Sequence, residues 1–167
     1  MKSISELDAA ALLQREAALL DMQRWDDWLD LYEEDCLFWV PSWRDDHALI
    51  DNPRAEVSFL YLRGKTALAE RVRRVVQGKS ITTHPLPRTS HQVSLPIWLE
   101  DDRLPESGAW HSQWVSHQYD PRTSEQKMLF GRYRHAFSQR SDTWKIREKV
   151  VTLINDRIAT VLDFYSV

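Results

Sequence analysis

Histidine is the residue type in this sequence best suited to acid–base chemistry or to metal binding. The chain contains six: His47, His84, His91, His111, His117 and His135. We consider a site in which Asp35 meets one or more of His91, His111 and His135 across a curved sheet. Histidines with a carboxylate would suit a non-haem iron triad, and a single histidine–carboxylate pair would suit general acid–base catalysis.

The competing interpretation is that these are hydrogen-bonded strand histidines without a chemical role. Spacing in a sequence supplies no geometry, so the structural role is the simpler interpretation. His111 and His117 lie six residues apart on one expected strand, which places them on one face but about 20 Å apart. One metal ion cannot bind both of them.

Cysteine and glycine are too scarce for several common kinds of cofactor site. Cys36 is the only cysteine, so the chain can form no internal disulfide and cannot supply the two cysteines of a Rieske centre. There are four glycines, and no glycine-rich nucleotide loop and no H-E-x-x-H motif occurs. We therefore expect no Rieske cluster and no nucleotide site on this chain and, with the histidines in structural roles, no cofactor and no metal on it.

The elements that would position such side chains follow from the hydrophobic pattern. Helical spacing covers residues 5–23, 25–32 and 66–77, and residues 33–35 are expected to form a helix end and turn. Strands are expected at 36–40, 57–62, 88–99, 109–120, 126–139 and 143–154. Gly131 is a candidate bulge or point of close approach. This order predicts an α+β fold, in which a curved antiparallel or mixed sheet carries the helices on its concave face.

Two arginines in the third long strand are candidates for binding an anion. Arg132 and Arg134 project from one side of the strand, with Tyr133 and His135 on the other. Arginine suits anionic substrates or the carboxylates of a partner. A solvated or ion-paired sheet face is the competing interpretation.

Length and composition predict a single domain over residues 1–167. The 43% of hydrophobic and 28% of charged residues are ordinary for a globular protein. The net charge of −3 gives no overall attraction to nucleic acid or to anionic lipid. Because no apolar run resembles a signal peptide or a membrane span, we expect a cytoplasmic protein.

Several segments match one known pattern in the same order along the chain. They are residues 24–28 (RWDDW), 32–36 (YEEDC), 39–43 (WVPSW), 85–91 (PLPRTSH), 130–134 (FGRYR) and parts of 149–165. Together they resemble the small (beta) subunit of aromatic-ring-hydroxylating dioxygenases, the Rieske non-haem iron oxygenases. Within that family the chain is most similar to the benzoate and anthranilate dioxygenase branch.

The resemblance implies both a fold and a role. The family fold is a cone-like α+β domain related to nuclear transport factor 2 and scytalone dehydratase. Family enzymes combine three large and three small subunits, and the large (alpha) subunit holds the Rieske iron–sulfur cluster, the mononuclear Fe(II) and the substrate pocket. A reductase, in some cases with a ferredoxin, delivers electrons from NADH, and the aromatic ring becomes a cis-dihydrodiol. The small subunit is mainly structural, so no catalytic residue is carried over to this chain.

The surface that would meet the large subunit is a separate expectation. Trp39 and Trp43 flank Pro41 beside a polar segment, and two indoles there could anchor a partner, although core packing competes evenly. With the stiff segment at Pro87 and Arg88, they are our candidates for the interface.

The alternative function is a stand-alone lyase or isomerase of the same fold. In that hypothesis Asp35 and His91 would transfer a proton inside the cone, with His111 nearby.

Overall fold

One mixed sheet and three helices make up the computed structural model, which describes residues 3–78, 85–101, 104, 108–140, 142–158 and 162–167. The elements in chain order are α1 (Glu6–Asp21), α2 (Trp25–Leu29), β1 (Tyr32–Pro41), β2 (Ser58–Arg63), α3 (Lys65–Val76), β3 (Arg88–Val93), β4 (Ile97–Glu100), β5 (Gly108–Tyr119), β6 (Gln126–Arg140), β7 (Thr143–Leu153) and the 3-10 turn η1 (Phe164–Ser166). The strand order is β2-β1-β7-β6-β5-β3, and β4 pairs with β5. β1 and β7 run parallel, whereas the other described pairs are antiparallel.

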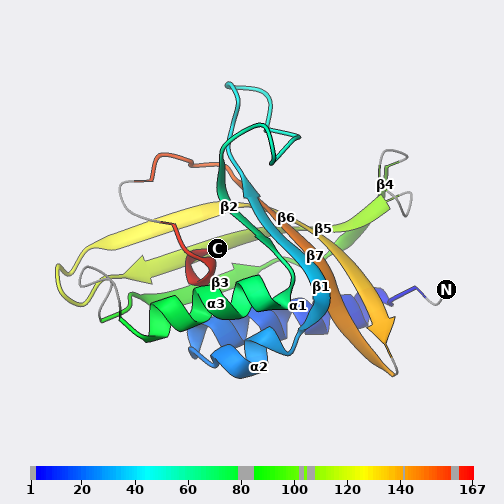
Figure 1. The fold of residues 1–167 in the computed structure, drawn as a ribbon, viewed down its shortest axis with the longest axis horizontal. Helices are drawn as coiled ribbons and strands as arrows, with labels where there is room; N and C mark the ends of the chain where they lie inside the picture. Colours follow the sequence, from blue (N-terminus) through cyan, green and yellow to red (C-terminus); the bar gives the residue numbers. More distant parts are fainter. Residues whose placement is uncertain (1–2, 79–84, 102–103, 105–107, 141, 159–161) are drawn as a thin grey trace.

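The three helices lie together on one side of the curved sheet, as Figure 1 shows. Their apolar stripes and the inward-facing strand residues form one hydrophobic core. The predicted α+β class and the placement of the helices are therefore confirmed. None of the described helices is both long and apolar enough to cross a membrane.

Helix α1 begins and ends at residues whose local chemistry favours a helix boundary. The Ser5 hydroxyl accepts a hydrogen bond from the Asp8 amide at 3.1 Å, which satisfies one of the free N–H groups of the first turn. At the other end Gln23 adopts a left-handed φ of 55°, and the Arg24 amide bonds back to the Leu19 carbonyl. The chain thus turns sharply into α2.

The prediction of a helix over residues 25–32 is wrong at its C-terminal end. Helix α2 stops at Leu29, and Tyr32 opens strand β1 in register with Ile146 of β7. Residues 33–35, expected to be a helix end and turn, therefore belong to β1. Tyr32 is fully buried, so it fits the apolar spacing of a helix although it belongs to a strand. Over a single turn, a buried residue fits both the helical period of about 3.6 residues and the strand period of about two residues, so burial does not distinguish them.

The expected strand over residues 88–99 is two strands. β3 and β4 follow one another along the same side of β5, and residues 94–96 separate them. Ser94 interrupts the ladder because its hydroxyl accepts from the Gln113 amide at 2.9 Å. Pro96 then has no N–H to donate.

Gly131 is a point of close approach, one of the two roles expected for it. A Cβ atom at this position would lie 1.9 Å from the Thr152 carbonyl oxygen of β7. The bulge of this strand pair lies elsewhere, between Ala136 and Phe137. The missing side chain therefore allows β6 and β7 to stay hydrogen-bonded at full length.

Replacing Gly131 by alanine should destabilise the protein because either β6 or β7 must move. We expect a loss of about 1–3 kcal/mol in the free energy of unfolding, measured by urea denaturation. Gln126→Ala, on the exposed start of the same strand, is the control and should change stability by less than about 0.5 kcal/mol. Equal stability of Gly131→Ala and the wild type would contradict this account.

Candidate functional site

His91 lies inside the cone, but its partner is Asp21 and not Asp35. The Asp21 carboxylate, at the end of α1, pairs with His91 Nδ1 at 2.6 Å and accepts hydrogen bonds from the His91 amide and the Thr89 hydroxyl, both at 2.8 Å. Although burial raises the pKa of Asp21, these bonds lower it below its ordinary value. The arrangement fixes the edge strand β3 to the end of α1.

Asp35 points away from the cone, so the predicted Asp35–His91 pair is wrong. The Asp35 side chain is 74% exposed, and its nearest charged partner is Arg140 at 3.7 Å. It lies in β1, where Cys36 and Phe38 are buried while Glu34 and Asp35 are exposed. The proton-transfer pair of the alternative hypothesis is therefore not assembled.

The remaining histidines are not brought together either. His135 faces the helices, in register with Trp110, whereas His111 pairs with Arg134 and lies on the outer face. His91 is in register with Ser116 of β5, whereas His135 is in register with Trp110 of the same strand. These two positions of β5 are six residues apart, so His91 and His135 are separated by about 20 Å along the strand direction. His47 and His117 are exposed, and His84 lies outside the described residues.

The described residues do not fit the ligand sets of the iron centres that the family implies. No group of three His, Cys, Asp or Glu side chains within the described part of the chain could hold a metal ion. Cys36 is buried, and burial raises the pKa of its thiol to about 11, so the thiol stays protonated. A Rieske cluster requires two cysteines and two histidines.

A buried ion pair, absent from the sequence-based candidates, occupies the middle of the cone. Lys149 Nζ of β7 lies 2.9 Å from Glu16 Oε1 of α1, and both side chains are buried. The same oxygen accepts from the Tyr32 hydroxyl at 2.5 Å and from the Trp28 indole N–H at 3.4 Å. The Lys149 ammonium also lies 4.3 Å from the centre of the Tyr133 ring.

Burial and mutual attraction act in opposite directions on the two charged groups. Burial raises the pKa of Glu16, but the positive charge of Lys149 and the hydrogen bonds it receives bring that pKa below its ordinary value. Burial lowers the pKa of Lys149, and the Glu16 carboxylate offsets part of the change. Each charge is thus tolerated inside the protein only because the other is present.

His135 lies beside this pair, in register with Lys149. It is fully buried and stacks on Phe137, with ring centres 5.8 Å apart. Burial lowers the pKa of His135 to about 3, so the ring is neutral near pH 7 and cannot act there as an acid.

The predicted interface tryptophans are both half-buried, and both use their indole N–H inside the chain. Trp39 donates to the Ser58 hydroxyl at 2.9 Å, and Trp43 donates to the Leu153 carbonyl at 2.7 Å. Each indole therefore has a structural role in addition to any role in an interface.

Pro87 and Arg88 lie at a different place in the sheet. Pro87 is half-buried, and Arg88 is exposed at the start of β3 with its guanidinium 5.8 Å from the centre of the Tyr119 ring. Three strands, β7, β6 and β5, separate β3 from the strand that carries Trp39. The four candidate residues thus do not form a single patch along the sheet.

Strand β4 and Leu95, which lies just before it, form an exposed apolar surface that the sequence analysis missed. Leu95, Ile97, Trp98 and Leu99 are 42–69% exposed, and no described strand other than β5 pairs with β4. Exposed apolar edge strands are rare in isolated proteins because they pair with other chains. The signal in the sequence was a run of large apolar residues that does not alternate with polar ones.

Comparisons with known proteins show the family to which the chain belongs. A sequence profile described as "Ring hydroxylating beta subunit" matches residues 15–160. The chain belongs to this family. The small subunit of anthranilate 1,2-dioxygenase from Acinetobacter baylyi is 32% identical over 157 residues, 93% of each chain. This beta subunit therefore serves an aromatic-ring-hydroxylating dioxygenase as its non-catalytic small subunit, which confirms the main prediction over the lyase or isomerase.

Solved structures confirm the fold of this beta subunit. The beta subunit of benzoate 1,2-dioxygenase from Burkholderia mallei matches with a TM-score of 0.78 and 32% identity over 100% of both chains. A scytalone dehydratase-type protein from Novosphingobium aromaticivorans matches with a TM-score of 0.61 over 87% of this chain and 81% of that one. At 14% identity the second match shows a shared fold alone.

Removing one member of the buried ion pair should destabilise this beta subunit far more than removing both. Lys149→Met leaves the Glu16 carboxylate buried without its counter-charge, and we expect a loss of about 3–5 kcal/mol in urea denaturation. The double variant Glu16→Leu with Lys149→Met should recover much of that loss.

The exposed ion pair between Arg24 and Asp27 is a matched control. Both side chains are about half exposed, so Asp27→Asn should cost less than about 1 kcal/mol. Strictly additive losses for the two changes at Glu16 and Lys149 would contradict the proposed dependence of one charge on the other.

Acidification should weaken the fold through His135. The unfolded chain takes up a proton near the ordinary histidine pKa of 6.5, whereas the folded pKa is about 3. This contribution to stability is therefore complete above pH 6.5 and is lost as the pH falls toward 3, by at most about 1.4 kcal/mol per pH unit. Urea titrations at several pH values should show a shallower loss for His135→Phe than for the wild type. The same slope in both proteins would show that His135 is not the group responsible.

Proposed function

We propose that this beta subunit assembles with a large oxygenase subunit into a complex of three large and three small subunits. The exposed apolar strand β4 carries the proposal, because a single chain would leave Leu95, Ile97, Trp98 and Leu99 in water. The large subunit would contain the Rieske cluster and the mononuclear Fe(II), for which the described residues here offer no ligand set. A reductase would supply electrons from NADH, and the complex would work in the cytoplasm.

The substrate of the complex would be an aromatic ring that bears a carboxylate. The relatives named after anthranilate and benzoate both act on carboxylated rings, and each is 32% identical to this chain. Addition of dioxygen to such a ring gives a cis-dihydrodiol. The beta subunit would contribute by holding the assembly together, since its own interior is filled by the Glu16–Lys149 cluster.

Native mass and iron content of the complex purified through a tag on this chain should test the assembly. We expect the wild type to bring down a larger, iron-bearing subunit. Ile97→Lys places a charge on the apolar strand and should release the partner without unfolding the chain, because the residue is exposed. Arg88→Glu and Trp43→Glu test two other candidate positions, which lie in different parts of the sheet, in the same way. Trp43→Glu also removes a hydrogen bond to Leu153.

Leu7→Lys provides the control, since Leu7 is an isolated apolar residue on α1 that is 80% exposed. It should leave the mass of the complex unchanged. A small, iron-free assembly of the wild-type chain alone would contradict the proposal. A complex unaffected by Ile97→Lys would remove β4 from the interface, and one unaffected by Arg88→Glu and Trp43→Glu would remove those residues.

A further inference from the structure

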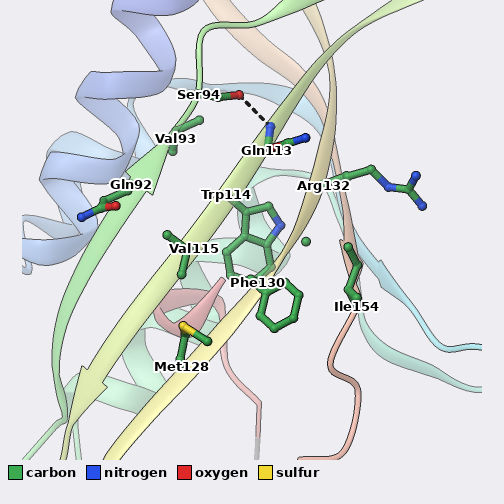
Figure 2. Close-up of a pocket in the computed structure, with 11 residues that line it drawn as sticks. Gln92, Val93, Ser94, Gln113, Trp114, Val115, Met128, Phe130, Arg132 and Ile154 are labelled. Atoms are coloured by element: carbon green, nitrogen blue, oxygen red, sulfur yellow. Dashed lines mark hydrogen bonds between the residues drawn. The ribbon is translucent and has the colours of Figure 1, made fainter.

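The outer face of the sheet, opposite the helices, contains a hollow of about 830 Å³ between β3, β5 and β6. Its volume is within the range of small-molecule sites, although it is open to solvent on one side. Figure 2 shows the side chains around it, with Gln92 at one rim and Arg132 at the other. The family assignment gives this hollow no role.

The lining combines an apolar wall with a few polar groups and one charge. Val115, Met128, Phe130 and Ile154 provide the apolar surface. Gln92, Ser94 and Gln113 provide amide and hydroxyl groups, and Arg132 is the only charged residue among the lining residues. None of the described lining residues is a carboxylate, so an anion would meet no like charge among them.

The positive charge of Arg132 is not neutralised by a neighbour. Arg132 has no ion-pair partner in the part of the chain that the structure describes, whereas Arg134, two residues along β6, pairs with Glu148 at 2.6 Å. The pKa of His111, on the adjacent strand, is lowered mainly by burial. The positive charges of Arg134 and Arg132 lower it further. An unpaired guanidinium beside apolar surface suits a carboxylate attached to an apolar group.

The walls of the hollow are held in place by hydrogen bonds between side chains and the backbone and by one bond between two backbones. The Asn155 side chain accepts from the Phe130 amide at 3.1 Å and donates to the Met128 carbonyl at 2.8 Å. Across the hollow, Ser94 and Gln113 are joined by two hydrogen bonds of 2.9 Å, one between backbones and one to the Ser94 hydroxyl. A preformed site of this kind loses little conformational entropy when a ligand binds.

We propose that this hollow binds a small organic carboxylate with an apolar body, such as an aromatic acid. The ring would lie against Phe130, Val115 and Ile154, and the carboxylate would bind the Arg132 guanidinium with the Gln113 amide beside it. The described residues that line this site all belong to the beta subunit.

Titration of the full chain alone with benzoate tests the proposal, because no large subunit is then present to bind the same acid. Amide signals of residues 113, 130 and 154 in two-dimensional NMR spectra should shift and saturate together. Benzamide, which has the same ring without the charge, should bind at least about tenfold more weakly, a difference of about 1.4 kcal/mol. Arg132→Gln should weaken benzoate binding to a similar extent while leaving benzamide unaffected.

Arg54→Gln, an exposed arginine of the loop before β2, is the matched control for the change of charge and should bind benzoate like the wild type. Equal binding of benzoate by Arg132→Gln and the wild type would overturn the proposal, as would shifts scattered over the surface without saturation. If benzoate does not bind but Arg132→Gln releases the large subunit, the hollow is a protein contact and the ligand site is disproved. The assembly proposed above can fail or succeed separately, since it is measured by native mass.

Discussion

The charge pair that Glu16 and Lys149 form inside the cone constrains how α1 and α2 are arranged on the sheet. A buried charge without its partner costs several kcal/mol, so α1 and β7 must stay within hydrogen-bonding distance of each other. Trp28 of α2 and Tyr32 of β1 donate to the same Glu16 oxygen, which means that four elements meet at one atom. A shift of α1 or α2 relative to the sheet would break several of these contacts together. The ion pair thereby constrains how these two helices sit on the sheet.

The same cluster shows how the acidic and basic groups of the interior are engaged in a fold that is shared with a scytalone dehydratase-type protein. A general base must reach a substrate and must change its charge near the working pH. The Glu16 carboxylate is already bound by three donors, and His135 has a pKa of about 3. His91 is held by Asp21 at the far end of β5. The carboxylates of Glu16 and Asp21 are therefore engaged in contacts between elements, and His135 stays neutral near pH 7.

Much of the fold was predictable because its signals are local. The amphipathic stripe of α3 between Gly64 and Gly78 and the alternation of the long strands determine their elements directly. The residues of the site were harder to predict, because contacts such as that between Asp21 and His91 join positions 70 residues apart. One signal was overlooked. Glu16 falls on the apolar stripe of α1, and Lys149 alternates with the buried Val151 and Leu153, so each charge lies on an inward face.

The two faces of the sheet differ in how their charged groups are paired. Toward the helices, the charges are paired with each other. On the outer face and at the edge, Arg132 lacks an ion pair within the described chain, and the apolar side chains of β4 remain in water. Groups that are satisfied within a chain contribute to its stability, whereas unsatisfied ones have free energy to gain by binding another molecule. The contacts of this beta subunit with other molecules are therefore to be sought on its surface, at Arg132 and at the exposed residues of β4.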